Sequence, residues 1–493
     1  MTPPMKLGKP GEEALSENCL DRISRLPDEL LSHILSFLPT PCAVSTSILS
    51  TRWRYLFTLT ACLSFDDTPC FGHPNRNEII EATRRFKEFV NKVLDLHRTS
   101  PIKKFSLQCR GNYDYSDLNR WISTAVQKSV QELHFKLTGQ VNRLTDGFYT
   151  SETLVSLKIA CFDYYVVQIP LSARLPKLKI LHLDRIIFFD FKSMERLFSC
   201  CEVLEELTLK YCLCEKHGHA THRTGALKVL TIDKCSFMLG TFEIDAPNLA
   251  YFTSRSNIGV KIVPSWKDSC SLVKAELTFK HDDDFDTNED SAGYDRELLR
   301  AAAYKTTKLS FEMESFQILL KLADDEQMPD FNSLSRLHLD SCTADSWKYV
   351  TSLLDKSPQL ETVIFDPGFH CCQCAGRRYL GQCYYVHDHD SPWPSDVLVP
   401  FSCHAKVIEV HDFCGHTGSL SLMGHLLRNA RVLKKLIVFT TCSFNLEEEM
   451  KISNDLLMLP RASVDCCVEI NKGSDDDNMP NFYAMSWVEL PRQ

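Results

Sequence analysis

The feature that most constrains this chain is an apolar pattern, L-x-x-L-x-L, which recurs beyond residue 100. Ten of the twelve intervals between neighbouring copies are 22 to 28 residues long. Such spacing is typical of a solenoid, in which each unit adds one short strand to a parallel sheet. Nine good copies begin at Ile102, Val130, Leu154, Leu178, Leu204, Leu227, Leu334, Leu360 and Leu433, and four degenerate copies begin at Leu249, Leu272, Thr306 and Ala405.

Cysteine positions support this periodicity. The pattern is the strand signature of leucine-rich repeats, which place Asn or Cys at the ninth position, pointing inward at the turn after the strand. Counting nine positions along three of the copies leads to Cys212, Cys235 and Cys342. We therefore expect these three thiols to be structural. Most of the 22 cysteines should be free, because so large a chain without secretory features indicates a reducing compartment.

Apolar residues at helical spacing predict helices around these strands. The segments MERLFSCCEVLEEL and SWKYVTSLLDKSPQLETV predict short helices on the convex face of the solenoid. Two further helices, over residues 77–97 and around Leu118 to Val126, precede the regular array. We expect them to join it to the N-terminal region.

Residues 21–59 predict a small head of three helices. Pro27 suits a first helical turn, and the apolar residues that follow it recur at every fourth position. Pro39 and Pro41 end this helix and start a second one, whose inner face should carry Ile48. Ser50 predicts the N-cap of a third helix.

So few residues cannot bury so wide an apolar surface alone. Either the head packs on the rest of the chain, or a partner protein completes its apolar face. The head resembles an F-box motif in its Leu26-Pro27 pair, in the helix from Glu29 to Leu38, and in Ser50 and Trp53 with Arg52 and Arg54 beside the tryptophan.

This resemblance implies binding to a Skp-type adaptor and, through it, to a cullin scaffold in an SCF-type ubiquitin ligase. By the pattern of the family, the adaptor-binding residues are Leu26, Pro27, Leu30, Ile34, Leu35, Leu38, Ser50 and Trp53.

Two intervals are long enough to be insertions, which in solenoids often carry binding sites. The shorter contains the acidic run 281–290, either a solvated loop or a docking site for a basic segment. The longer holds Cys371, Cys374, Cys383 and His387, a ligand set of the kind zinc takes. Poor spacing favours an ordinary cysteine-rich loop, and a second cluster (Cys212, Cys214, His217, His219 and His222) is weaker still. We expect no metal or cofactor.

The region from Trp393 onward alternates strand, helix, strand, helix and strand. It resembles the FBD region at the C-terminus of many plant F-box proteins with leucine-rich repeats. The matching features are Trp393-Pro394, Val399-Pro400, a helix ending in Asn429-Ala430, and the run from Pro460 to Ser463. Phe401-Ser402-Cys403 departs from the family, which has Cys-Leu after the Val-Pro pair.

Composition excludes several classes of function. With 55 basic and 64 acidic residues the formal charge is −9, which argues against nucleic-acid binding. No run of eighteen apolar residues predicts a membrane span, and the first residues do not resemble a signal peptide. The sequence contains no P-loop, G-x-G-x-x-G, G-x-S-x-G or H-E-x-x-H motif. We expect an intracellular, non-catalytic binding protein of the nucleus and/or cytoplasm.

The expected fold is α/β: a three-helix F-box head, an irregular leucine-rich-repeat solenoid with a curved parallel sheet and convex helices, and an FBD region. The expected function is the substrate-recognition subunit of an SCF-type ligase, which binds an unknown target protein through the repeats. Alternatives are a repeat scaffold without a ligase role and a metal-dependent module. The expected divisions are a disordered tail 1–19, F-box 20–60, helical linker and start of the solenoid 61–127, repeats 128–370, Cys/His-rich insertion 371–392, FBD region 393–471, and C-terminal tail 472–493.

Overall fold

The computed structural model describes residues 23, 25–72, 75–97, 101–111, 113–138, 146–237, 240–255, 260–263, 271–280, 298–312, 328–339, 344–366, 400–413, 415–440 and 446–472. The chain divides into two compact units, residues 1–185 and 186–493. The acidic run 281–290, Cys342 and the zinc candidates at 371–387 lie outside the described residues.

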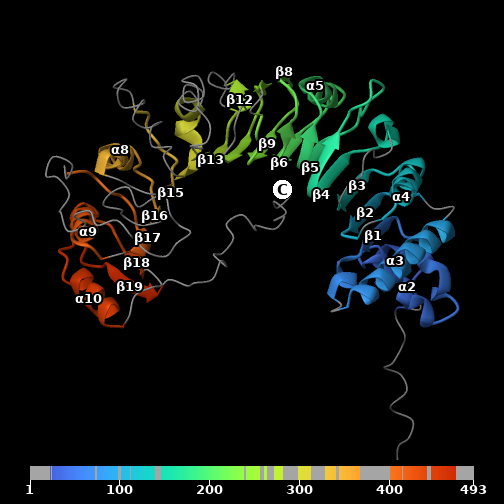
Figure 1. Cartoon of the computed structure of the whole chain (residues 1–493), viewed down its shortest axis with the longest axis horizontal. Helices are drawn as coiled ribbons and strands as arrows, with labels where there is room; N and C mark the ends of the chain where they lie inside the picture. The colour runs from blue at the N-terminus through green and yellow to red at the C-terminus, as the bar shows by residue number, and fades with distance from the viewer. Residues whose placement is uncertain are drawn as a thin grey trace, which may run out of the picture. The chain divides into compact units, whose positions relative to one another are not determined.

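The first unit begins with a helical head and continues into parallel strands (Figure 1). Both α-helices of the head begin directly after a proline, Pro27 and Pro39, whose fixed φ suits the start of a helix. The elements are α1 (Asp28–Leu35), α2 (Thr40–Ser45), the 3₁₀ turns η1 (Thr46–Ile48) and η2 (Trp53–Leu59), β1 (Cys62–Asp66), η3 (Thr68–Gly72), α3 (Arg76–Leu96), β2 (Lys104–Cys109), α4 (Tyr115–Gln127), β3 (Glu132–Leu137), η4 (Asp146–Thr150), β4 (Ser156–Val167) and β5 (Ile180–Phe188), which crosses the boundary.

Strands β1 to β4 of this unit pair in sequence order, all parallel. Their alternation places one residue of every two in the core, so Leu63, Phe105, Leu133 and Leu157 lie opposite one another and are buried. Helices α3 and α4 confirm the two helices predicted before the array. The indole N–H of Trp121 joins them by donating to Asn91 Oδ1 at 2.7 Å.

The second unit continues the same construction. Its strands pair in parallel in the order β6-β9-β11-β13-β14-β15-β16-β17-β18-β19. In Figure 1 the helices α8, α9 and α10 lie along one face of the last strands. The elements are α5 (Phe191–Ser199), β6 (Glu206–Lys210), β7 (Leu213–Cys214), β8 (Gly218–Arg223), β9 (Val229–Asp233), β10 (Gly240–Asp245), β11 (Tyr251–Arg255), β12 (Val260–Val263), β13 (Lys274–Lys280), η6 (Ala303–Lys305), β14 (Thr306–Glu312), β15 (Arg336–Leu339), α8 (Ala344–Asp355), β16 (Thr362–Phe365), β17 (Val407–Phe413), α9 (Thr417–Asn429), β18 (Lys435–Thr440), α10 (Leu446–Leu457) and β19 (Cys467–Lys472).

All thirteen predicted repeat copies are confirmed as parallel strands. Twelve of these strands begin two residues after the first apolar position, and β14 begins on it, at Thr306. The first residue of every copy is at most 1% exposed, because it fills the core beneath its strand. The predicted helices α5 and α8 are confirmed, as is the strand–helix alternation from β17 to β19.

The turn after the strand has its own recurring conformation. Arg185, Tyr211, Lys234 and Asp412 each occupy the eighth position of a copy, and all have φ between 50° and 57°. The ninth side chain then turns into the core, where Cys212 and Cys235 are buried, as predicted.

Two features of the fold differ from expectation. A three-stranded parallel sheet, β12-β10-β8, was not predicted. The third helix of the head is the 3₁₀ turn η2, with no side-chain cap, so the prediction that Ser50 is its N-cap was wrong. Among the described residues no helix has both the length and the apolar character needed to cross a membrane.

Candidate protein-binding surface

The head buries one side of each helix and exposes the other. In α1, Leu31 and Leu35 are buried, whereas Leu30 is 50% and Ile34 is 45% exposed. These are neighbouring pairs in the sequence, so the helical turn sends one member inward and the next one outward. A helix whose outward face carries large aliphatic side chains suits a protein partner.

The turn that follows α2 adds two aliphatic side chains to this exposed set. Ile48 is 87% exposed and Leu49 is also exposed, although the sequence placed Ile48 on the inner face. That prediction was wrong because the chain tightens from α2 into η1, which shifts the angular position of the last residues. We define the open apolar face as Leu30, Ile34, Phe37, Leu38, Ile48 and Leu49.

The turn η2 supplies the centre of the head. Trp53, Leu56 and Phe57 are buried and pack beneath α1 and η1, whereas Tyr55 and Leu59 remain exposed. The tryptophan therefore holds the helices together and presents little surface to solvent.

An arginine clip connects η2 to the start of α1. The guanidinium of Arg52 donates to Asp28 Oδ1 from Nη2 at 2.6 Å and from Nε at 2.9 Å, and also to the backbone carbonyl of Leu26. This clip holds the Leu26-Pro27 segment against the start of η2. The sequence indicated Arg52 only as a neighbour of Trp53, because Arg52 and Asp28 are 24 positions apart and no pattern reveals their contact.

The eight residues predicted to bind the adaptor do not form a single surface. Leu35 is 2% and Trp53 is 9% exposed, so both belong to the core of the head, and the structure does not present them to a partner. Burial favours a supporting role for these two side chains; as direct contacts they remain predictions. Of the remainder, Leu26 is half-buried, and the exposed ones are Pro27, Leu30, Ile34, Leu38 and Ser50.

The opposite flank of the head is attached to the first repeats. Thr40 Oγ1 accepts a hydrogen bond from the backbone N–H of Ser64 in β1 at 2.7 Å. The Ala61 carbonyl accepts from the N–H groups of Lys103 and Lys104, at 2.7 and 3.1 Å. The ring Nε2 of His97 lies 2.7 Å from the Thr60 carbonyl. One side of the head is therefore bonded to its own chain, while the six side chains of the open apolar face remain 39% to 87% exposed.

Polar clusters elsewhere have structural explanations. Buried Asp67 accepts from the N–H groups of Arg110 and Gly111 and from the Tyr113 hydroxyl, all within 2.9 Å. Burial and this carboxylate raise the pKa of Tyr113 far above its ordinary value. Since every one of these groups is satisfied, the cluster closes the turn after β2.

The fold also disfavours the second candidate metal cluster, that of Cys212, Cys214, His217, His219 and His222. Cys212 and Cys214 are buried, and Cys214 has a pKa raised by burial, which disfavours the thiolate that zinc requires. Buried His222 packs on the Phe198 ring. Within the described part of the chain, no group of three His, Cys, Asp or Glu side chains could hold a metal ion, and every cysteine there is a free thiol.

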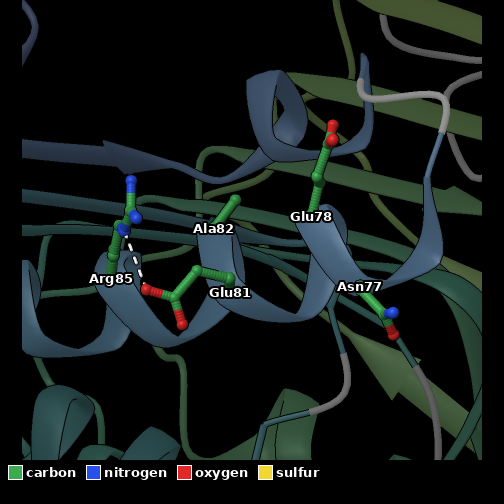
Figure 2. Close-up of a pocket in the computed structure, with 5 residues that line it drawn as sticks. All are labelled: Asn77, Glu78, Glu81, Ala82 and Arg85. Carbon is green, nitrogen blue, oxygen red and sulfur yellow. Dashed lines mark hydrogen bonds and ion pairs between the residues drawn. The ribbon is translucent and has the colours of Figure 1, made fainter.

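A hollow of about 460 Å³ lies on the first turns of α3, lined by Asn77, Glu78, Glu81, Ala82 and Arg85. All five side chains come from one helix, and Figure 2 shows the ion pair between Glu81 and Arg85. Glu81 also forms an ion pair with Arg84. These pairs lower the pKa of Glu81 to about 2. A hollow with its charges so paired offers no reactive group.

Fold and head together define a class: a small helical docking module joined to a leucine-rich-repeat sheet. An F-box domain model matches residues 23–61, and the model described as At1g61320/AtMIF1, LRR domain matches residues 93–465, more than half of the chain. This chain belongs to the F-box/LRR-repeat family.

Relatives from Arabidopsis thaliana agree. F-box protein At3g59000 is 31% identical, with 85% of this chain and 87% of the relative covered. F-box/LRR-repeat protein At2g42730 is 31% identical, with 92% and 98% covered. At3g59240, whose name describes an F-box/FBD/LRR-repeat protein, is 28% identical, with 94% and 91% covered. Family membership implies a substrate-receptor type of role, and the F-box domain implies binding to a Skp-type adaptor.

Proposed function

We propose that this protein is the substrate-recognition subunit of an SCF-type ubiquitin ligase. The head binds a Skp-type adaptor, the adaptor binds a cullin scaffold, and the repeats bind a target protein. The observation that carries the proposal is the open apolar face of the head, whose six large side chains remain exposed although other parts of the head bond to β1 and to His97, the residue after α3.

The chemistry of that face supports a protein as its partner. Aliphatic and aromatic side chains at the spacing of one helix and one turn suit a groove between the partner's helices. Covering them removes apolar area from water, which stabilises a complex by about 25 cal/mol per Å² before the costs of association. The clip between Arg52 and Asp28 connects the start of α1, which carries two residues of this face, to η2.

In this role the chain contributes proximity and performs no chemistry of its own. Binding target and ligase together makes ubiquitin transfer to the target's lysines effectively intramolecular. The reaction belongs to other subunits. The free thiols of the described cysteines support a reducing compartment, and we place the complex in the nucleus and/or cytoplasm.

The proposal is tested with purified full-length chain and a Skp-type adaptor in a calorimetric binding assay. The double variant Ile34→Asp/Ile48→Asp changes only exposed side chains and should weaken binding by on the order of 100-fold or more, the loss of two hot spots. The matched control is Ile80→Asp, an equally apolar residue that is 60% exposed on α3. Its affinity should equal that of the unmodified chain.

Melting temperatures of all three proteins should agree, which separates lost binding from lost folding. Unchanged affinity in the double variant would contradict the proposal. It would favour a repeat scaffold without a ligase role, whose head does not recruit an adaptor.

A further inference from the structure

The core-facing residues of the last strand, β19, are more exposed than those of the first strand, β1. Core-facing Leu63 and Phe65 of β1 are each 1% exposed; α2 of the head contacts this strand, and the Phe65 ring packs on Phe89 of α3. In β19 the core-facing residues are Val468 and Ile470, which lie opposite the buried Leu436 and Val438 of β18. Both β19 side chains are nevertheless half-exposed. A solenoid that ends in this way leaves its core open.

The backbone of β19 is open on the same side. Among the described residues β18 is the only strand paired with β19. The N–H of Cys467 donates to the Lys434 carbonyl on the β18 side at 2.9 Å. Since N–H groups alternate between the two edges of a strand, those of Val468 and Ile470 point to the unpaired edge. Unpaired edges readily accept another strand.

The sequence after β19 has the composition of such a strand. Residues 481–490, NFYAMSWVEL, lie between Pro480 and Pro491 and are rich in aromatic and apolar residues. In an extended conformation Tyr483, Met485 and Trp487 share one face. Proline is tolerated at the first position of a strand, so Pro480 is compatible with this assignment.

The connection between the two segments determines their relative direction. Residues 473–480, GSDDDNMP, are eight in number and rich in turn-forming residues. A parallel crossover needs about a dozen or more residues, whereas an antiparallel return needs only a short loop. We propose that residues 481–490 pair antiparallel with β19 and cap the repeat core by covering Val468 and Ile470.

Hydrogen–deuterium exchange on the full-length chain tests the cap through a peptide spanning residues 467–472. In the variant Tyr483→Asp/Trp487→Asp, this peptide should exchange at least about tenfold faster than in the unmodified chain. The conservative control, Tyr483→Phe/Trp487→Phe, should exchange like the unmodified chain. A peptide spanning β18, residues 435–440, is the internal reference and should remain slow in all three proteins, which excludes general unfolding.

Equal exchange of β19 in the unmodified chain and the Asp variant would overturn the proposal. Protection of β19 that rises with protein concentration, together with a dimer in light scattering, would also overturn it, because the edge would then be covered by a second copy. A truncated chain ending at Asn478 should reproduce the Asp variant, with fast β19 and slow β18.

Discussion

His97 and Thr60 connect the end of the head to the end of α3. The imidazole Nε2–H of His97, which is completely buried, donates to the carbonyl of Thr60 at 2.7 Å. This bond assigns the proton of the neutral ring to Nε2, and the other ring nitrogen has no hydrogen-bond partner among the described residues. A buried neutral histidine therefore holds Thr60, the residue that follows the last turn of the head.

Replacing His97 with Ala should destabilise the first unit. The substitution leaves a cavity and an unsatisfied carbonyl, so we expect the free energy of unfolding to fall by about 2–4 kcal/mol. Urea denaturation monitored by far-UV circular dichroism measures the loss. Thr124→Ala, on the exposed face of α4, is the control and should change the stability by less than about 1 kcal/mol. Equal stability of both variants would contradict the anchoring role.

His134 should make stability depend on pH. Burial and, after it, the charges of Lys158, Lys104 and His182 together lower its pKa to about 3. Because the folded-state pKa lies below the ordinary value of 6.5, the unfolded chain binds a proton first as the pH falls. The stabilising contribution is therefore present above pH 6.5 and is lost progressively between pH 6.5 and 3. Chemical denaturation across this range should show a smaller slope for His134→Gln than for the unmodified chain, and identical slopes would disprove the assignment.

Eighth repeat positions with a left-handed backbone, such as Lys234, should reject β-branched residues. Lys234 has φ of 51°, a left-handed conformation that costs non-glycine residues about 1–2 kcal/mol and β-branched ones more. Lys234→Val should thus lower the free energy of unfolding by about 1–2 kcal/mol, whereas Lys234→Gly should be neutral or slightly stabilising. Lys210→Val, in the regular strand β6, is the control and should be tolerated. Thermal melts rank the variants, and a neutral Lys234→Val would refute the steric explanation.

Leu35 and Trp53 should respond as core residues. Truncating either to Ala removes a buried side chain and should cost about 2–5 kcal/mol, so any loss of adaptor binding should accompany partial unfolding of the head. Near-UV circular dichroism and proteolysis of the purified variants detect that unfolding. Loss of adaptor binding while the head stays fully folded would indicate that these residues contact the adaptor directly.

The clip between Arg52 and Asp28 should contribute little to stability, since both side chains are at least a third exposed. A double-mutant cycle with Arg52→Ala and Asp28→Ala should give a coupling energy of about 1 kcal/mol or less, decreasing at high salt. A salt-insensitive coupling above about 2 kcal/mol would indicate a more desolvated contact.

The repeat strands were predictable because burial enforces their apolar spacing: positions one, four and six are buried in every copy except at Ser254, the half-buried sixth residue of the copy that begins at Leu249. The sheet β12-β10-β8 could not be predicted, because the β8 sequence GHATHR has Ala220 and His222 where a strand pattern needs larger apolar residues. In β8 the neighbouring strand and the Phe198 ring supply the packing that the sequence pattern does not reveal.

In the head the sequence located the helices but could not orient them. Leu30 and Leu31, or Ile34 and Leu35, are equally apolar neighbours, and periodicity alone cannot decide which of each pair is buried. The answer depends on Trp53 and Phe57, which pack from a separate turn. Tertiary packing also exposes Ile48, which helical spacing had placed inside.

Only Thr60 and Ala61 separate the head from the first strand, and the Ala61 carbonyl is already bonded to the next repeat. A partner bound to the head is consequently held in a nearly fixed orientation relative to β1. Two glycines inserted after Thr60 would make this rigid connection flexible. If the receptor role holds, recruitment would survive such an insertion, while the choice of which target lysines are modified would broaden.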